Sequence, residues 1–414
     1  MHYAWAVLAG CCALVFGIGL TVNVIGQYFV PVTAELGLGM GKFTFYHALR
    51  GVCLVASTAM LNKWLEKVEI RLLLSGCFII QLLCTALMGT FTAVWQWYIA
   101  GAVMGFFLSP VYFQIPPIIL SNWFVKKRGL VIGIAVAFSG IGGAIMNPII
   151  AHIIEIYGWR FAYLANAIIA GVVVLPFLMF VIRLKPSDMG LKPYGYEEQM
   201  AQAQDGSAAA EKNAAMVKGV MREDILRSPS FVIMIVLFAA AGFFSGYPQY
   251  LTAYGITIGY AATLSSFLLS LSMVGNALTK LILGYICDKF GGKVMIFIAY
   301  SLVLISLVLL IIGTRSMPAL LVGSFLAGTY YSVSTVGTPL FIQTVYGSRD
   351  YAKIYVLLSL SQNFFISFGP SIVGFMYDFS GGYSLPFMVG IFIVAAAVFL
   401  AISSIKTSKK LTWS

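Results

Sequence analysis

Two ten-residue stretches decide the fold of this chain: NKWLEKVEIR at residues 62–71 and GYICDKFGGK at residues 284–293. They lie 222 residues apart, and each has an acid followed by Lys, with a basic residue at its end. The same offset aligns Pro148 with Pro370. Apolar segments flank both copies, so a membrane-spanning unit is repeated within the chain. Many secondary transporters are built from such repeats, with the substrate held between the halves.

The composition indicates a membrane protein. Of 414 residues, 60% are hydrophobic and only 9% are charged, which is too few to cover a soluble protein. Apolar runs of about 20 residues recur, each long enough to cross roughly 30 Å of hydrocarbon. We therefore expect an all-α membrane protein with twelve transmembrane helices in two pseudo-symmetric six-helix bundles. The predicted helices are 4–30, 41–61, 72–91, 95–121, 129–156, 160–182, 229–254, 260–286, 294–313, 317–345, 352–377 and 383–404.

One polar stretch, residues 183–228, divides the two predicted bundles. It is rich in Ala, Gln, Glu and Lys, and its seven basic residues balance its seven acidic residues. Such a segment is too short and featureless for a catalytic domain. The predicted domains are therefore an N-terminal six-helix bundle over 1–182, a cytoplasmic linker over 183–228 and a C-terminal six-helix bundle over 229–414.

The net charge of +11 follows membrane orientation and does not indicate nucleic-acid binding. With the N-terminus inside, 20 of the 25 Lys and Arg residues fall on the inner side. Only Lys42, Arg160 and Arg315 fall in outer loops, while Arg50 and Lys280 lie inside predicted helices. This distribution predicts a multi-pass protein of the cell's inner (plasma) membrane with both termini in the cytoplasm.

The cysteine and histidine patterns indicate neither a disulfide framework nor a metal site. The six Cys lie in or at the ends of apolar helices, as free core cysteines do, and the three His are scattered. The chain also lacks a phosphate-binding ATP loop and a nucleophile–base pair. We expect no cofactor and no enzymatic activity, and we expect transport to be driven by gradients.

Small residues in the fifth predicted helix are spaced for close packing. Gly129, Gly133, Ala137, Gly140 and Ala144 are separated by 4, 4, 3 and 4 residues, so they share one helical face. In lipid such a face lets two helix backbones approach closely. It suits either a helix that slides during transport or plain static packing.

Two basic residues inside predicted helices carry the strongest functional signal. Lys280 lies 8 residues before Asp288, about 12 Å along the helix, which places it near the bilayer midplane. Arg50 lies 16 residues before Glu66, about 24 Å from the same edge, where a long side chain can snorkel. No acid is predicted deep in a span, so an anionic ligand is the expected counter-ion. Lys280 is the predicted substrate-binding cation, and Arg50 is predicted as a second cation or outer-gate residue.

Polar residues on nearby predicted helices are further candidates. Asn276 lies one turn before Lys280, where it could orient the lysine, donate to a carboxylate or make only a packing hydrogen bond. Tyr330 and Tyr331 cannot both face one cavity, and we favour Tyr331. Tyrosine hydroxyls beside one lysine suit a small hydroxy-acid or keto-acid. The other binding candidates are Tyr112, Gln114 and Asn363, with Tyr28 nearer the outer mouth.

The repeated loop is predicted to act as an inner gate. Its acids can pair with cytoplasmic basic residues and with helix N-termini, closing the gate in one state and releasing it in another. A solvated surface pair is the simpler alternative, but repetition at a fixed offset favours the gate. The predicted inner-gate residues are Glu66, Arg71, Arg128, Gly284, Asp288, Lys289 and Lys293.

These motifs resemble those of a known family. Residues 284–293 are similar to the loop signature of the major facilitator superfamily, and residues 62–71 are a degraded copy with Asn62 in place of Gly. Residues 123–133, WFVKKRGLVIG, resemble the helix 4–5 region of monocarboxylate transporters and oxalate:formate antiporters. YGWR at residues 157–160 is also typical of them. The resemblance implies the major facilitator fold, with two bundles that rock around a midplane site.

The resemblance also implies a substrate class. Monocarboxylate transporters carry an Asp and an Arg one turn apart on helix 8, and the matching positions here are Asn276 and Lys280. Lys280 keeps a basic residue at the Arg position, but Asn276 replaces the acid that serves proton coupling. We expect symport of a small monocarboxylate such as lactate or pyruvate with a proton. The alternative is a carboxylate anion exchanger. The expected partners are the anion, the proton and the lipid bilayer, and a monomer suffices.

Overall fold

A computed structural model of the chain describes residues 2–58, 60–111, 115–125, 128–196, 219–347, 349–408 and 411. The chain divides into two compact units. The first comprises Met1–Leu38 and Phe45–Gly206, and the second comprises Gly39–Thr44 and Ser207–Ser414. The change of unit after Gly206 lies within the predicted linker. The grouping of Gly39–Thr44 with the second unit has no counterpart in the predicted domains.

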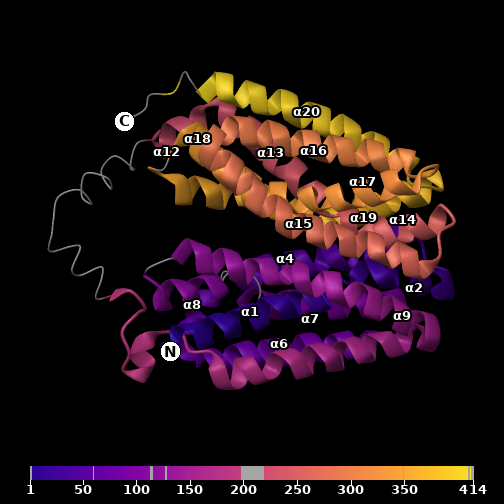
Figure 1. Cartoon of the computed structure of the whole chain (residues 1–414), viewed down its shortest axis with the longest axis horizontal. Coiled ribbons are helices and arrows are strands. Elements are labelled where there is room, and N and C mark those ends of the chain that lie inside the picture. Colours follow the sequence, from indigo (N-terminus) through magenta and orange to yellow (C-terminus); the bar gives the residue numbers. More distant parts are fainter. Residues whose placement is uncertain are drawn as a thin grey trace. The chain divides into compact units, whose positions relative to one another are not determined.

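The helices of the first unit run side by side (Figure 1). The predicted helices 129–156 and 160–182 form one long element, α9, which Gly158 interrupts with a φ of 79°. A positive φ is readily adopted by glycine alone, so this residue separates the two predicted spans. The elements of the first unit are α1 (Ala4–Thr21), η1 (Ile25–Tyr28), α2 (Phe29–Leu36), α4 (Tyr46–Thr58), α5 (Leu61–Lys67), α6 (Ile70–Met88), α7 (Val94–Val111), α8 (Ile115–Trp123), α9 (Arg128–Pro176), η2 (Phe177–Val181) and η3 (Pro186–Met189).

The second unit repeats this arrangement with its own set of side-by-side helices (Figure 1). Its long spans are α15, α16, α19 and α20, while α17 and α18 continue one another through a short π-helical segment, η5. The elements are α3 (Met40–Thr44), α12 (Arg222–Arg227), α13 (Pro229–Phe244), η4 (Tyr247–Tyr250), α14 (Leu251–Thr257), α15 (Ala262–Phe290), α16 (Gly292–Ile312), α17 (Met317–Ser332), η5 (Val333–Gly337), α18 (Thr338–Tyr346), α19 (Tyr351–Ser380) and α20 (Ser384–Ser408).

Each of the twelve predicted ranges contains helix in this structure. Within the described residues, nine helical stretches are long and apolar enough to cross a membrane, and one of them, Gly129–Val181, holds two of the predicted spans. The predicted spans 41–61 and 95–121 correspond to shorter helices, α4 with 13 residues and the apolar stretch Val94–Leu108. The sequence prediction of an all-helical membrane protein is therefore confirmed.

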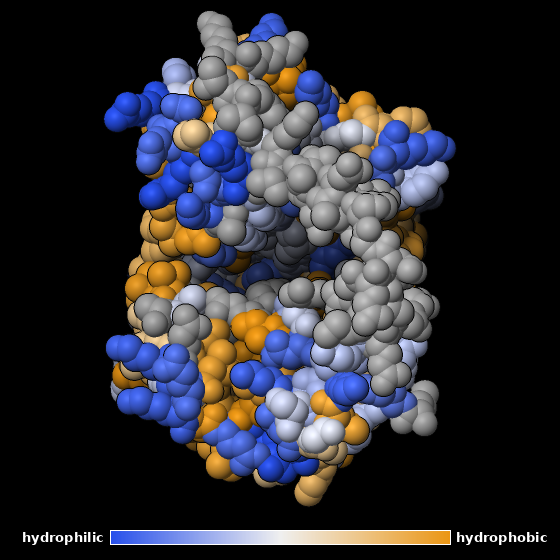
Figure 2. Space-filling view, turned by 90° about the vertical axis from the view of Figure 1, so that its left-hand side faces the viewer, coloured by the Kyte–Doolittle hydropathy of each residue, from blue (hydrophilic) through white to orange (hydrophobic). Residues whose placement is uncertain are grey.

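The surface of the helices is that of a protein solvated by lipid. Large apolar side chains point outward along the spans, including Phe392 at 75% exposure and Val172 at 72%. Contiguous apolar exposure of this kind is rare on soluble monomers. Figure 2 looks onto the end of the second unit where α12 and α18 lie in Figure 1, and hydrophilic side chains gather there. Apolar flanks with a polar end agree with helices that cross the bilayer.

Candidate functional site

Lys280 lies in the middle of α15 and is half-buried. Within the described part of the chain, its amine makes no hydrogen bond and no ion pair. The ion pairs Glu35–Arg160, Glu69–Arg71 and Asp350–Lys353 all lie elsewhere. A lysine in a span without an acidic partner is expected to face a cavity and to meet an anion there. The structure therefore leaves Lys280 available for the predicted role.

A close crossing of α15 and α17 fixes the backbone beside Lys280. A Cβ atom on Gly275 would lie 1.9 Å from the backbone oxygen of Phe325, and one on Gly328 would lie 2.1 Å from the backbone nitrogen of Asn276. Only glycine fits at either position, as is usual where membrane helices touch. This crossing holds the helix that carries Lys280 against the helix that carries Tyr331.

Hydrogen bonds reinforce this crossing on the residues adjacent to the two candidates. The hydroxyls of Thr279 and Ser332 are 2.6 Å apart, and Ser332 also donates to the backbone oxygen of Asn276 at 3.1 Å. Thr279 directly precedes Lys280, and Ser332 directly follows Tyr331. A satisfied buried network of this kind rigidifies the site. Such preorganisation lowers the entropic cost of binding a ligand.

Asn276 takes part in the same helix contact. Its side chain is 5% exposed, and its Oδ1 accepts a long hydrogen bond of 3.4 Å from Ser332. The structure thus shows the packing interaction that was one of the three interpretations from sequence. Its role as a ligand stays a prediction.

The two adjacent tyrosines of α17 face different surroundings. Tyr330 is fully buried, and its hydroxyl donates to Ser306 of α16 at 2.9 Å. Tyr331 is half-buried. The hydroxyl of Tyr330 is committed to a helix contact, and the hydroxyl of Tyr331 also has a hydrogen-bond partner in the Gln249 side chain. The role of Tyr331 as a ligand stays a prediction.

On α19, Gln362 and Asn363 also differ. Gln362 is buried and donates to Ser334 and Thr338 at 2.9 and 3.0 Å, so its amide ties α19 to the π-helical turn η5 and the start of α18. Asn363 is half-buried, and only its backbone oxygen is used, as an acceptor for Ser367. Asn363 therefore keeps its side chain for another partner.

The candidates of the first unit are less uniform. Tyr28 is 1% exposed and stacks on Tyr163, with ring centroids 3.8 Å apart, so it serves as packing in this structure. Arg50 is half-buried on α4, and its Nη1 is buried without a hydrogen-bond partner among the described residues. Tyr112 and Gln114 lie outside the described residues.

The predicted inner-gate residues form no common ion-pair network within the described residues. Glu66, Asp288, Lys289 and Lys293 are exposed, and Gly284 is half-buried. Arg71 pairs with Glu69, which the prediction did not include, and Lys289 donates to the Tyr285 hydroxyl at 3.2 Å. Arg128 begins α9, but its side chain lies outside the description. The gating role of this loop stays a prediction.

The YGWR motif has a structural role that sequence reasoning missed. Arg160 pairs with Glu35 at 2.9 Å and donates to the backbone oxygens of Gly89 and Phe91 at 3.2 and 3.0 Å. Trp159 donates to the same Glu35 carboxylate. The motif thereby joins the ends of α2, α6 and the second half of α9. The signal available in the sequence was an acid at the end of the first span.

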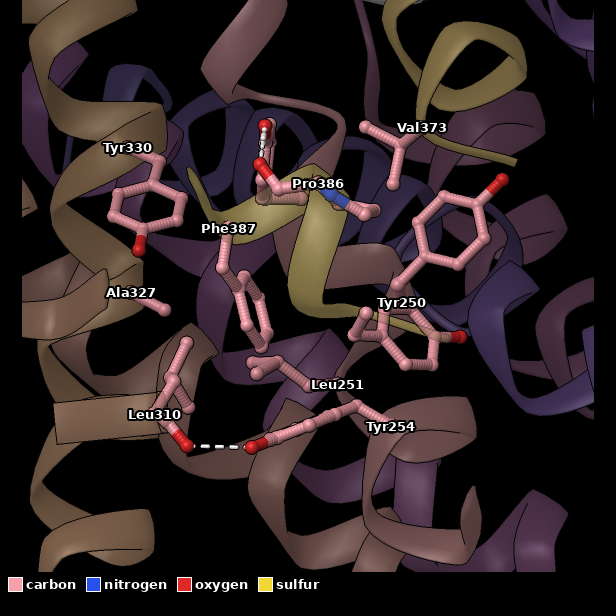
Figure 3. Close-up of a pocket in the computed structure, with 11 residues that line it drawn as sticks. Tyr250, Leu251, Tyr254, Leu310, Ala327, Tyr330, Val373, Pro386 and Phe387 are labelled. Atoms are coloured by element: carbon pink, nitrogen blue, oxygen red, sulfur yellow. Dashed lines mark hydrogen bonds between the residues drawn. The ribbon is translucent and has the colours of Figure 1, made fainter. Parts of the chain in front are cut away.

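A small pocket in the second unit is a packing feature. Figure 3 shows its wall of tyrosines with Phe387, Leu251 and Val373. Its free volume is about 10 Å³, room for about one water molecule and too little for a carboxylate. Tyr247 and Tyr254 donate to backbone oxygens of Pro386 and Leu310, so their hydroxyls are already used. The described residues contain no group of three His, Cys, Asp or Glu that could hold a metal.

Comparison with known proteins agrees with this architecture. The family model of the Major Facilitator Superfamily matches residues 9–271 and 257–413. Monocarboxylate transporter 12 of Mus musculus is 21% identical over 415 residues, which cover 94% of this chain and 82% of that protein. The oxalate:formate antiporter of Oxalobacter formigenes is 22% identical over 283 residues, covering 66% of this chain and 61% of that protein.

Solved structures share the fold at low sequence identity. A bacterial homologue of the human lysosomal transporter Spinster, inward-facing and occupied, aligns with a TM-score of 0.69 and 14% identity, covering 99% of this chain and 98% of that chain. A D-xylose–proton symporter aligns with a TM-score of 0.67 and 17% identity, covering 98% and 97%. These matches are membrane transporters and not enzymes.

Proposed function

Because the chain belongs to the Major Facilitator Superfamily, we propose that it transports a small monocarboxylate, of the lactate or pyruvate kind, together with a proton by alternating access. The observation that carries this proposal is Lys280, a half-buried lysine in a span with no acidic partner among the described residues. Relatives named as monocarboxylate transporters support the substrate class.

The physical case for Lys280 is electrostatic. An unpaired charge away from water is costly, so a site that holds one is stabilised when an opposite charge enters. Two unit charges 4 Å apart attract by about 4 kcal/mol at the effective dielectric typical of proteins. Tyr331 and Asn363, which are half-buried on α17 and α19, would add hydrogen bonds and fix the orientation of the anion.

Carboxylate exchange is the second candidate, and Asn276 favours it. The position that carries an acid in monocarboxylate transporters is an amide here, and it is tied to Ser332. An amide cannot carry the coupled proton, so Lys280 itself would have to release and regain one. If it does not, the carrier exchanges one carboxylate for another. The likeness to an oxalate:formate antiporter supports this alternative.

The orientation is part of the proposal. We place the protein in the plasma membrane. The distribution of its basic residues predicts that both termini and the 183–228 linker face the cytoplasm. Protease accessibility of N- and C-terminal tags in sealed right-side-out vesicles tests this. Cleavage before the vesicles are opened would contradict the orientation.

The function is tested by uptake of labelled L-lactate into proteoliposomes, with and without an inward proton gradient. We expect gradient-driven uptake in the unaltered protein and none in Lys280→Ala. Lys406→Ala, which makes the same chemical change at an exposed lysine of α20, is the matched control. Uptake by Lys280→Ala at the unaltered rate would contradict the site.

The same assay separates symport from exchange. Uptake that ignores pH but requires a carboxylate inside the vesicles would establish the exchanger, and vesicles loaded with oxalate or formate would then identify the counter-substrate. Absence of any carboxylate transport, with the protein folded, would contradict both proposals.

A further inference from the structure

The first unit contains two buried nitrogens without an acceptor, and both come from one helix. The Nη1 of Arg50 and the Nε2 of His47 are shielded from solvent and have no hydrogen-bond partner among the described residues. His47 is only 3% exposed. The two residues are three positions apart on α4, so they lie on neighbouring parts of one helical face.

The position of this pair is set by a close helix contact. A Cβ atom on Gly105 of α7 would lie 2.0 Å from the backbone oxygen of Arg50, and one on Gly101 would lie 2.7 Å from that of Tyr46. The backbone of α4 is therefore pressed onto α7 over one turn. From the sequence we expected the Arg50 side chain to reach toward water, but its Nη1 atom is buried.

Aromatic rings wall the site. The rings of Tyr46 and Phe29 lie 4.2 and 6.2 Å from the His47 ring, centroid to centroid. These rings exclude water and lower the local dielectric, which strengthens any charge interaction at this point. An apolar wall with a few convergent donors is the usual construction of a small-ligand site.

None of the ion pairs recorded among the described residues includes Arg50. Glu35 pairs with Arg160, Glu69 pairs with Arg71, and Asp188 accepts from the backbone of Lys185. Glu66 is exposed in α5, the helix that follows α4. A water molecule could accept hydrogen bonds from both nitrogens, but it would leave the charge of Arg50 uncompensated in a low dielectric.

We infer that the first unit holds an anion-binding subsite of its own, in which the Arg50 guanidinium and the His47 imidazole bind a small carboxylate or halide. The guanidinium supplies charge and a directed N–H, and the imidazole tautomer protonated at Nε2 supplies a second donor. This subsite goes beyond the role proposed for Lys280 and does not depend on it. A transporter with this subsite responds to two anions.

The test removes Lys280 first. Purified full-length Lys280→Ala protein in detergent is unfolded thermally in sodium acetate, sodium chloride or sodium gluconate at equal ionic strength, with gluconate as the bulky comparison anion. Binding of a small anion at about ten times its Kd should raise the unfolding temperature by ~1–2 °C. Acetate and chloride distinguish a carboxylate site from a site for any small anion.

Variants then locate the site. Adding Arg50→Gln should abolish the acetate or chloride effect, whereas Arg50→Lys should keep part of it. Arg315→Gln, which removes an exposed arginine from a loop of the second unit, should leave the effect unchanged. His47→Gln keeps the Arg50 guanidinium but removes the imidazole donor. The anion concentration that gives half of the rise in unfolding temperature should therefore increase about tenfold. This variant keeps the test decisive if the Arg50→Gln protein is unstable.

Two results would overturn the inference. One is the absence of any anion effect in Lys280→Ala, and the other is an effect that persists undiminished in Lys280→Ala/Arg50→Gln. Either result leaves the transport proposal standing, because that proposal is judged by lactate uptake through Lys280.

Discussion

The carboxylate of Asp378, near the end of α19, accepts hydrogen bonds from the backbone N–H groups of Met40 and Gly41, each at 2.8 Å. These are the first N–H groups of α3 and have no acceptor within the helix. A carboxylate there also interacts favourably with the helix dipole. Ser371 adds a hydrogen bond to the backbone oxygen of Thr44 at 3.0 Å. The segment Gly39–Thr44 is therefore held within the second unit by hydrogen bonds at both of its ends.

Replacing Asp378 with Ala should loosen α3. Two buried or half-buried N–H groups lose their acceptor, and each loss costs about 1–3 kcal/mol of local stability. Hydrogen-exchange mass spectrometry should show faster exchange of the Met40 and Gly41 amides, by roughly tenfold or more. Asp378→Asn, which keeps one acceptor oxygen, should have a smaller effect. Unchanged exchange in Asp378→Ala would show that these bonds do not hold the segment.

Gly275 and Gly133 form a matched pair for testing the close crossing of α15 and α17. A Cβ atom on Gly275 would meet the Phe325 backbone oxygen at 1.9 Å, whereas Gly133 has open space within 4 Å. Gly275→Ala should destabilise the protein by about 1–3 kcal/mol through overpacking. Gly133→Ala should be neutral or stabilising by about 0.4–1 kcal/mol. Thermal unfolding of both variants checks this, and equal effects would contradict the geometry.

Arg160 should matter more than its ion-pair partner Glu35. The pair is partly exposed, with side-chain exposures of 38% and 49%, so the pair alone is worth at most about 1 kcal/mol. Arg160 also satisfies the backbone oxygens of Gly89 and Phe91. Arg160→Gln should therefore cost more stability than Glu35→Gln. A double-mutant cycle by thermal unfolding measures the coupling, and equal losses from the two single variants would contradict this account.

Asp350 should contribute a pH-dependent term to stability. The Lys353 ammonium hydrogen bond, followed by the Arg222 backbone N–H, lowers the pKa of Asp350 below its ordinary value of 3.8. Because the folded pKa is depressed, the contribution is present above about pH 4 and is lost as the pH falls through the folded value. The stability difference between the unaltered protein and Asp350→Asn should shrink from pH 5 to pH 3. A constant difference would contradict the assignment.

The helices, and the places of Lys280 and Arg50 within helices, were predictable from sequence. Apolar runs, the repeat at 222 residues and the position of Lys280 relative to Asp288 all placed features along the helix axis, and the structure has helix in every predicted range. Hydropathy is additive over a local window, and helical rise converts residue number into depth. Both properties can be read without knowing which helices are neighbours.

The sequence did not predict which residues of different helices contact one another. The small-residue stripe of residues 129–144 suggested one packing face, but Gly129 and Gly133 have open space, and α1 instead meets α9 at Gly142. Glu35 and Asp378 gave no local sign of their partners, Arg160 and Met40. The sequence favoured Tyr331 over Tyr330, but it gave no sign that the Tyr330 hydroxyl bonds Ser306 on another helix.

The sequence by itself therefore determined that this is an all-helical membrane protein with an internal repeat, and that two cations lie inside its helices. Only the tertiary structure decided which polar groups are used in packing and which are left for a ligand. The reason is that depth and apolarity are properties of one segment. Satisfaction of a hydrogen bond or a charge depends on residues that the fold brings together from positions more than a hundred residues apart, as Glu35 and Arg160 show.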